Sequence, residues 1–343
     1  MFKAVAGYYK DNERLRLLVK IIAVWLISRA VMLLMVPVMN LIADEPHQWL
    51  YYMNPWDAEW YKGIVENGYQ PPKSSGMASW AFFPLYPLVC MAVRLVTMGS
   101  IDTYAVGMTV SNICIIIAVY YAVKYADIEL DMKIYNKKTV EDIFIFLMLA
   151  GPFAVYYGAM YTEALFILCV ILCYYNTARH NYMAAGIAAA MACATRIVGC
   201  MLRLVLILYM FMETCAECRA KHNSEMKDNK EAGIIDKCML TEEAGILIAG
   251  NISLASVIRT FIKNVIKEPK KFVAIMISPL GIFIYMNYLR YFCGDSWAFY
   301  HVQRAWRTQK MFPVIGVLFK SCTGQLSAAS GVRTLNGIIL GWL

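Results

Sequence analysis

Long apolar runs separated by shorter polar stretches dominate the chain. The first run covers residues 17–42. Further runs cover about 81–98, 104–123, 143–158, 160–178, 182–212, 244–258, 272–292, 311–320 and 331–343. Several are long enough to cross a hydrocarbon core about 30 Å thick, which takes about 20 residues of helix. Because a bilayer offers no water to unpaired backbone groups, the pattern predicts an all-α polytopic membrane protein with about eight to ten transmembrane helices.

Some of these runs depart from a simple span. The run 81–98 contains two prolines, so we expect it to be kinked or only partly inserted. The run 182–212 contains two arginines and is one broken helix or two. The run 244–258 is only weakly apolar. Because the last run stops at Leu343 without a polar tail, we expect the natural protein to extend further.

The composition agrees with a membrane protein and excludes several other classes. Hydrophobic residues make up 60% of the chain and charged residues 16%, whereas soluble domains have about 25% charged residues. The net charge of +8 follows the positive-inside rule, and no nucleic-acid-binding motif accompanies it, so no nucleic acid partner is expected. The 11 cysteines lack regular spacing, and the single C-x-x-C of Cys215 and Cys218 is weak evidence for zinc.

Charge also predicts which loops face which side of the membrane. The basic excess in residues 1–20 puts the N-terminus in the cytoplasm, next to a first run too long for a cleavable signal peptide. The loop at about 43–80 then lies on the outer face. The hydrophilic stretch 213–243 reads as a surface loop, and the basic cluster 259–271 as cytoplasmic. Residues 293–310 would share the outer face with the loop at 43–80, so that two polar loops build one site.

The first outer loop contains the most unusual pattern. Asn54 followed by proline is typical of a helix start, and Gly68 of a helix end, so a short amphipathic helix in the membrane interface is expected. Asp57 would lie in its first turn. Spacing alone favours a capping box between Asp57 and Asn54. The alternative is an ionised carboxylate that accepts a proton from a sugar hydroxyl. Glu59 points elsewhere on this helix and is more often just solvated.

Two further places hold charges beside apolar residues. Glu163 enters an apolar run and needs a partner or water. Arg196 either binds an anionic group such as a lipid phosphate or pairs with Glu163 for structure. Later in the chain, Asp295 begins an expected helix, and Arg304 and Arg307 share one of its faces. That face holds a phosphate, or belongs to an aromatic and basic interfacial belt.

These residues resemble a known family, the PIG-V-like mannosyltransferases, which include the second mannosyltransferase of GPI-anchor synthesis and its bacterial relatives. The blocks that carry the resemblance occur in the family's order over most of the chain. They are Trp56-Asp57-Ala58-Glu59-Trp60-Tyr61, Phe82-Phe83-Pro84-Leu85-Tyr86-Pro87, Tyr161-Thr162-Glu163-Ala164-Leu165-Phe166, Ala194-Thr195-Arg196, and Gly294-Asp295 with Ala298-Phe299 and Gln303. Ser296-Trp297 departs from the family's pattern in the late loop.

The resemblance implies a GT-C membrane glycosyltransferase, a helical bundle in which residues 1–343 form one transmembrane domain. Such an enzyme moves mannose or a similar hexose, with inversion, from a polyprenyl-phosphate donor to a glycolipid, cell-wall or protein acceptor on the outer membrane face. Its partners are that donor, the acceptor and membrane lipids. The membrane is the plasma membrane in a bacterium and that of the endoplasmic reticulum in a eukaryote.

The resemblance also assigns roles to residues. Asp57 is the presumed base, and Glu59 is the second candidate catalytic acid. The expected substrate-binding residues are Trp56, Trp60, Tyr61, Glu163, Arg196, Asp295, Gln303, Arg304 and Arg307. The pair Asp57-Ala58-Glu59 suggests a divalent Mg²⁺ or Mn²⁺, but two carboxylates alone make a poor site, so no metal site is assigned.

Two other functions are compatible with the residues. A lipid flippase or transporter would use the charges of Arg29, Glu163 and Arg196 along a translocation path. Transporters often show two similar halves, and no such internal repeat is found here. A non-catalytic relative of the glycosyltransferases is the other alternative.

Overall fold

The computed structural model describes residues 12–42, 48–72, 76–130, 134–231 and 253–305. Within these ranges the regular structure is helical and contains no strand, which confirms the predicted all-α class. The chain divides into two compact units. The larger unit comprises residues 1–68 and 82–288, and the smaller one residues 69–81 and 289–343.

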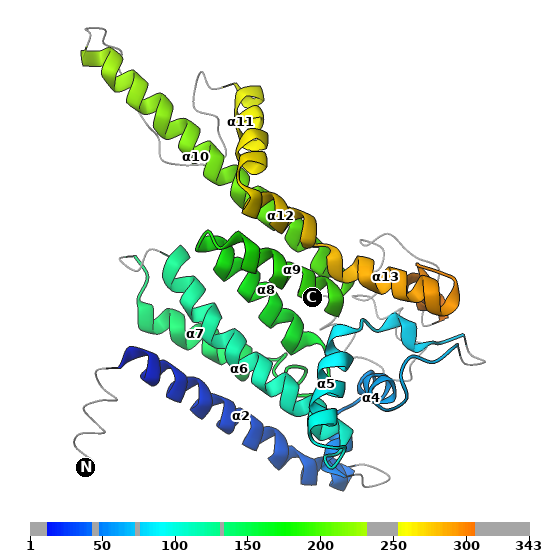
Figure 1. Ribbon diagram of the computed structural model, residues 1–343. Coiled ribbons are helices and arrows are strands. Elements are labelled where there is room, and N and C mark those ends of the chain that lie inside the picture. The colour runs from blue at the N-terminus through cyan, green and yellow to red at the C-terminus, as the bar shows by residue number, and fades with distance from the viewer. Residues whose placement is uncertain (1–11, 43–47, 73–75, 131–133, 232–252, 306–343) are drawn as a thin grey trace, which may run out of the picture. The chain divides into compact units, whose positions relative to one another are not determined.

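Helices of the larger unit pack side by side as a bundle (Figure 1). Its elements are α2 (Glu13–Ile42), α3 (Trp49–Met53), α4 (Ala58–Asn67), α5 (Leu85–Val96), α6 (Thr103–Glu129), α7 (Lys137–Leu149), α8 (Glu163–Ala178), α9 (Tyr182–Thr195), η2 (Ile197–Met201), α10 (Leu202–Glu231), α11 (Leu254–Lys267), α12 (Pro269–Ile277) and most of α13 (Leu280–Cys293). Helix α2 packs against α6 and α7, α6 against α8, α8 against α9, and α9 against α12. The bundle thus forms layers in which α6 and α8 lie between α2 and α9.

Small residues allow the close approach between α9 and its neighbours. A Cβ atom added at Gly186 would lie 2.8 Å from the backbone of Ala274, and one added at Gly281 would lie 2.1 Å from the carbonyl oxygen of Ala190. Close contacts of this kind through small residues are typical of helix packing in membranes. They explain why α9 is rich in alanine.

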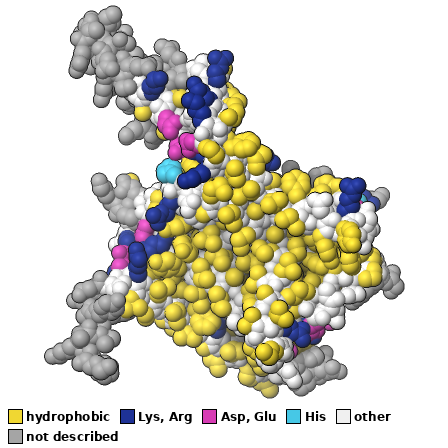
Figure 2. Space-filling model, in the orientation of Figure 1, with side chains coloured by type: hydrophobic (Ala, Val, Ile, Leu, Met, Phe, Trp, Pro, Cys, Tyr) yellow, Lys and Arg dark blue, Asp and Glu magenta, His cyan; other side chains and the backbone are white. Residues whose placement is uncertain are grey.

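The surface of the protein is that of an integral membrane protein. Among the described residues, four helical stretches are long and apolar enough to cross a bilayer, namely Glu13–Leu41, Thr103–Glu129, Ile197–Lys221 and Pro269–Cys293. Helices α5, α8 and α9 are shorter apolar helices. Figure 2 shows one face that is almost continuously hydrophobic, with charged side chains gathered at its edges. Large apolar side chains with no protein neighbour are stable only where lipid covers them.

One segment differs from the expected spans, and a second takes one of the two forms left open for it. The run 143–158 ends its helix at Leu149, and residues 150–162 form successive turns, since Gly151-Pro152 interrupts the helix. The run 182–212 is two helices, α9 and α10, divided at Arg196. The predicted count of eight to ten spans stays a prediction, because the runs 311–320 and 331–343 and most of 244–258 lie outside the described residues.

The prediction of a surface loop at 213–243 is wrong for the first half of this stretch. Helix α10 continues to Glu231, and residues 232–252 lie outside the described residues. No Gly or Pro occurs between Leu202 and Glu231, and Glu, Lys, Ala and Met are strong helix formers. The hydrophilic composition of this stretch was therefore not evidence for a loop.

The described part of the smaller unit is short. It holds η1 (Ser79–Ala81), α14 (Ala298–His301) and η3 (Val302–Ala305). The ring of Trp80 lies edge-on to that of Phe292, with centroids 6.4 Å apart. Asp295 precedes α14, and its carboxylate accepts a hydrogen bond from the backbone N–H of Trp297 (2.8 Å).

Candidate functional site

The turn before α4 is built differently from the predicted helix cap. Asn54 follows α3 and does not begin α4: its amide donates to the carbonyl oxygen of Leu50 (2.9 Å), and its Oδ1 accepts from the N–H of Met160 (2.7 Å). Asp57 immediately precedes α4, but its side chain makes no capping hydrogen bond. The capping-box interpretation of Asp57 is therefore wrong, whereas the predicted short helix and its end at Gly68 are confirmed.

Backbone strain lies directly beside this carboxylate. Trp56 has a φ of 51°, a left-handed conformation that bulky side chains rarely adopt. The hydroxyl of Tyr161 holds the chain on both sides of it, donating to the carbonyl oxygen of Pro55 (2.5 Å) and accepting from the N–H of Asp57 (3.2 Å). Strain of this kind persists where the surroundings enforce it, and it clusters at functional sites. The turn thus fixes the backbone from which the Asp57 side chain extends.

The aromatic side chains of α4 pack mainly against other protein side chains, and they do not line an open path for a sugar. Tyr61 is buried and packs edge-on to Phe82 and Tyr86, with centroids 5.0 and 5.4 Å away. Burial raises the pKa of Tyr61, so its hydroxyl stays neutral. Trp60 stacks on Phe82 at 5.7 Å. Of the three aromatic residues predicted to bind substrate, only Trp56 is largely open, with 71% of its surface exposed.

Residues 150–162, which carry Tyr161, are held by a clamp that sequence reasoning missed. Arg29 of α2 donates from Nε to Oδ1 of Asn112 (2.8 Å) and from Nη1 to the carbonyl oxygen of Ala154 (2.8 Å). Asn112 in turn donates to the carbonyl oxygen of Gly158 (3.2 Å). Arg29 is only 9% exposed, and no carboxylate pairs with it among the described residues. The position of Arg29 as a single charge in an apolar run was the feature of the sequence that could have indicated a buried structural role.

An ion pair lies at the start of α8. Arg196, in the break between α9 and η2, donates from Nη1 to Oε1 of Glu163. The second carboxylate oxygen, Oε2, is buried and has no hydrogen-bond partner among the described residues. The Arg196 side chain is 44% exposed. The sequence left open whether Arg196 binds phosphate or pairs with Glu163; the pair is present, and the arginine keeps an open side.

Both members of this pair act electrostatically on Asp57. Partial loss of hydration raises the pKa of the Asp57 carboxyl, the negative charge of Glu163 raises it further, and the positive charge of Arg196 lowers it. The residue as a whole is exposed, so the carboxylate is open to solvent on one side while protein atoms crowd the other. The carboxylate of Asp57 forms no hydrogen bond or ion pair with the residues that the structure describes. The structure therefore brings together Asp57, Glu163 and Arg196, and their charges also act on the buried hydroxyl of Tyr61.

The other charged and polar residues predicted for the site are described each in its own surroundings. Glu59 is exposed, and its charge acts on Tyr104 of α6. In the smaller unit, a hydrogen bond from His301 (2.6 Å) lowers the pKa of Asp295. Gln303 and Arg304 lie in η3, where Arg304 is exposed. Arg307 lies outside the described residues.

No group of three His, Cys, Asp or Glu side chains that could hold a metal ion occurs among the described residues. Asp57 and Glu59, the acid pair that left a divalent metal possible, have different neighbours. Among the described residues no third acid, His or Cys joins them as a ligand.

Comparison with protein families gives one match. The model of the family described as Mannosyltransferase (PIG-V) matches residues 3–230, which include the cluster of Asp57, Glu163 and Arg196. Comparisons with curated proteins and with solved structures find no match. Because the family model covers well over half of the chain, the protein is a membrane glycosyltransferase that belongs to the Mannosyltransferase (PIG-V) family.

Proposed function

We propose that this enzyme moves mannose, or a similar hexose, from a polyprenyl-phosphate donor to a hydroxyl of a glycolipid, cell-wall or protein acceptor. The reaction takes place on the outer membrane face and inverts the anomeric carbon. One observation carries the proposal most directly. An uncommitted carboxylate, Asp57, lies under the electrostatic influence of the ion pair of Arg196 and Glu163.

Asp57 has the properties of a general base. Its carboxylate is free of the hydrogen bonds that would hold it in a cap, and its raised pKa makes it a better proton acceptor than an ordinary aspartate. Tyr161 and the strained turn at Trp56 fix the backbone from which its side chain extends. In the proposed step the acceptor oxygen attacks the anomeric carbon as its proton passes to Asp57.

Arg196 is suited to the leaving group. As the new glycosidic bond forms, the bond between the anomeric carbon and the phosphate oxygen breaks, and polyprenyl phosphate departs with the electron pair. A guanidinium beside this oxygen stabilises the developing charge. Arg196 is exposed on one side and makes a single ion pair with Glu163. A phosphate can therefore bind its open side, while Glu163 keeps the guanidinium in place.

The late loop of the smaller unit keeps its predicted role in substrate binding. Asp295, Gln303, Arg304 and Arg307 stay predicted substrate-binding residues, and Arg304 offers an exposed cation. We assign acceptor choice to this loop, because its residues Ser296-Trp297 depart from the family's pattern.

Reconstitution tests the proposed reaction. Purified protein in proteoliposomes is supplied with polyprenyl-phosphate mannose and candidate lipid acceptors, and the product's anomeric configuration is read by NMR. The proposal expects transfer with inversion. Movement of a labelled lipid across the bilayer without any sugar transfer would instead support a flippase, and retention of configuration would refute the single displacement.

Accessibility labelling tests the membrane face. A cysteine introduced at the exposed Glu59 position is treated with an impermeant maleimide in oriented vesicles, with the native cysteines as background. The proposal expects labelling from the non-cytoplasmic side. Labelling only from the cytoplasmic side contradicts the use of an outward-facing donor.

A further inference from the structure

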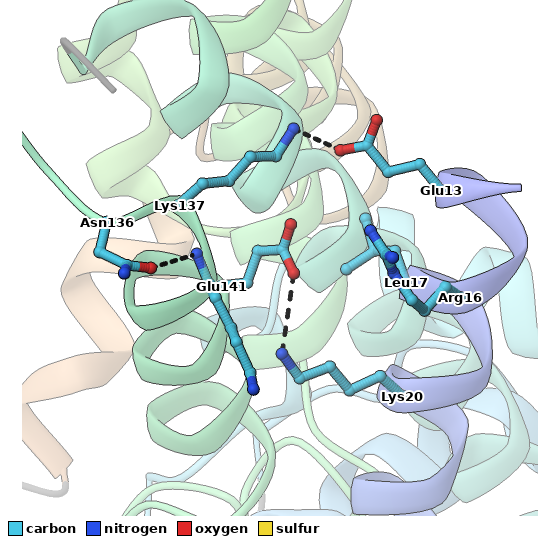
Figure 3. Close-up of a pocket in the computed structure, with 8 residues that line it drawn as sticks. Glu13, Arg16, Leu17, Lys20, Asn136, Lys137 and Glu141 are labelled. Carbon is cyan, nitrogen blue, oxygen red and sulfur yellow. Dashed lines mark hydrogen bonds and ion pairs between the residues drawn. The ribbon is translucent and has the colours of Figure 1, made fainter. Parts of the chain in front are cut away.

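A charged cavity lies at the end of the bundle where α2 begins (Figure 3). Its volume is about 600 Å³, within the usual range of ligand pockets. It is lined by Glu13, Arg16, Leu17, Lys20, Asn136, Lys137, Lys138 and Glu141. Helix α2 has 30 residues, a length of about 45 Å. The cavity at its start and the Asp57 loop beyond its end thus lie near opposite ends of this helix.

The acids of the cavity are already neutralised. Lys137 forms an ion pair with Glu13, and Lys20 forms one with Glu141 (3.7 Å). Figure 3 shows both pairs reaching from one helix to the other. Helix α7 is capped by Asn136, whose Oδ1 accepts from the backbone N–H of Lys138 (3.0 Å). These contacts tie α2 to α7 and leave no acid of the lining without a basic partner.

Two cations of the lining form no ion pair, although the charge of Arg16 acts on Glu13. Arg16 and Lys138 are both exposed, and neither side chain forms an ion pair or hydrogen bond with a residue that the structure describes. The lining as a whole has four basic and two acidic side chains, and Lys20 and Lys137 also pair with Asp142 and Asp127 outside it. An anion bound in the cavity would therefore meet Arg16 and Lys138, the two cations of the lining that form no ion pair with a described residue.

The flank of the cavity is apolar and exposed. On α2, Leu18, Val19 and Ile22 are 37–42% exposed, and on α7 Ile143 and Phe146 are 51% and 60% exposed. A soluble anion would bind only the cations and leave this apolar surface uncovered. A lipid would contact both the cations and the apolar flank, because its phosphate binds cations while its acyl chains cover apolar side chains.

We infer that this cavity binds the phosphate headgroup of an anionic membrane lipid, at a site separate from the sugar-transfer site. Arg16 and Lys138 contact the phosphate, and the acyl chains lie along the exposed faces of α2 and α7. Since the same cavity holds the ion pairs that join these helices, the bound lipid stabilises the contact between α2 and α7.

Lipid exchange in nanodiscs tests this inference. Full-length protein is placed in nanodiscs of phosphatidylcholine with a minor share of phosphatidylglycerol, and retained lipids are counted by native mass spectrometry. Wild type is expected to retain phosphatidylglycerol selectively. The variant R16A/K138A is expected to lose about thirtyfold in affinity, which corresponds to about 2 kcal/mol from two cations near an anionic headgroup.

A matched variant separates a specific site from general basic charge. R14A/K270A removes the same charge from exposed residues outside the cavity. It is expected to retain phosphatidylglycerol as wild type does. Equal losses in the two variants, or no enrichment of phosphatidylglycerol in wild type, would overturn the inference. Stabilisation of the wild type by inorganic phosphate alone, to the same degree as by the lipid, would also overturn it.

The folding of the variants is checked by thermal unfolding in phosphatidylcholine alone, where both should match wild type. If R16A/K138A unfolds early, R16Q keeps a polar side chain of similar reach while removing the charge. R16Q is expected to retain less phosphatidylglycerol than wild type, with a smaller loss than in R16A/K138A. Retention equal to that of wild type would contradict the proposed lipid site.

Discussion

Opposite shifts in the pH dependence of transfer are expected when the ion pair beside Asp57 is broken from its two sides. Glu163 raises and Arg196 lowers the pKa of Asp57. In the variant Glu163→Gln a negative charge is lost and Arg196 is left without its partner, so the pKa of Asp57 falls. In Arg196→Gln the positive charge is lost and Glu163 is left without its partner, so the pKa of Asp57 rises.

The size of the shift follows from Coulomb's law. Two unit charges about 8 Å apart, at an effective dielectric constant of about 20, interact by about 2 kcal/mol. Because Asp57 is exposed on one side, solvent screening reduces the effect of each substitution to a fraction of this energy.

The assay is the pH dependence of kcat/KM in proteoliposomes, whose acidic limb reports the pKa of the free enzyme's base. Asp57 must be ionised to act, so the limb should move to lower pH in Glu163→Gln and to higher pH in Arg196→Gln. The double variant removes both charges and should return the limb towards that of wild type. The assignment of Asp57 as the titrating base would be refuted if both single variants shift the acidic limb in the same direction. It would also be refuted if neither variant shifts it.

Three further outcomes are expected. Tyr161→Phe removes the hydroxyl that holds the backbone on both sides of Trp56, so transfer should fall about tenfold, as for a lost hydrogen bond of about 1–1.5 kcal/mol; wild-type kcat would contradict this role. Arg29→Gln removes two charge-assisted hydrogen bonds to the clamp and should destabilise the protein by about 2–4 kcal/mol in thermal or denaturant unfolding, and an unchanged midpoint would show the clamp to be dispensable. Chelation with EDTA should leave transfer unchanged, because Arg196 supplies the cation; activity restored specifically by Mn²⁺ or Mg²⁺ would support the metal hypothesis instead.

Periodicity and composition were enough to predict the class of fold. Apolar runs of about 20 residues have few alternatives to helices in a bilayer, and the breaks at Gly151-Pro152 and Arg196 follow from residues visible in the sequence. The continuation of α10 to Glu231 was missed because polarity was taken as evidence for a loop, whereas the residues are helix formers.

Local spacing predicted the wrong partner for Asp57. An asparagine with an acid three residues later matches a capping box, but tertiary contacts decide the outcome here. The Asn54 side chain accepts a hydrogen bond from the N–H of Met160, and the N–H of Asp57 donates one to the Tyr161 hydroxyl. Both contacts join residues more than 100 positions apart, so no local pattern reveals them. The pair of Glu163 and Arg196 was open to prediction, because an intramembrane charge needs a partner.

The most direct test of the account compares substitutions of the two acids in the first loop. Sugar transfer from polyprenyl-phosphate mannose is measured in proteoliposomes for wild type, Asp57→Asn and Glu59→Gln, with thermal unfolding as the check on folding. Loss of an oriented general base should reduce kcat by about 10²–10⁴-fold in Asp57→Asn, with a much smaller change in Glu59→Gln. Wild-type transfer by a folded Asp57→Asn protein would contradict the central claim, and a selective loss in Glu59→Gln would move the base to the second acid.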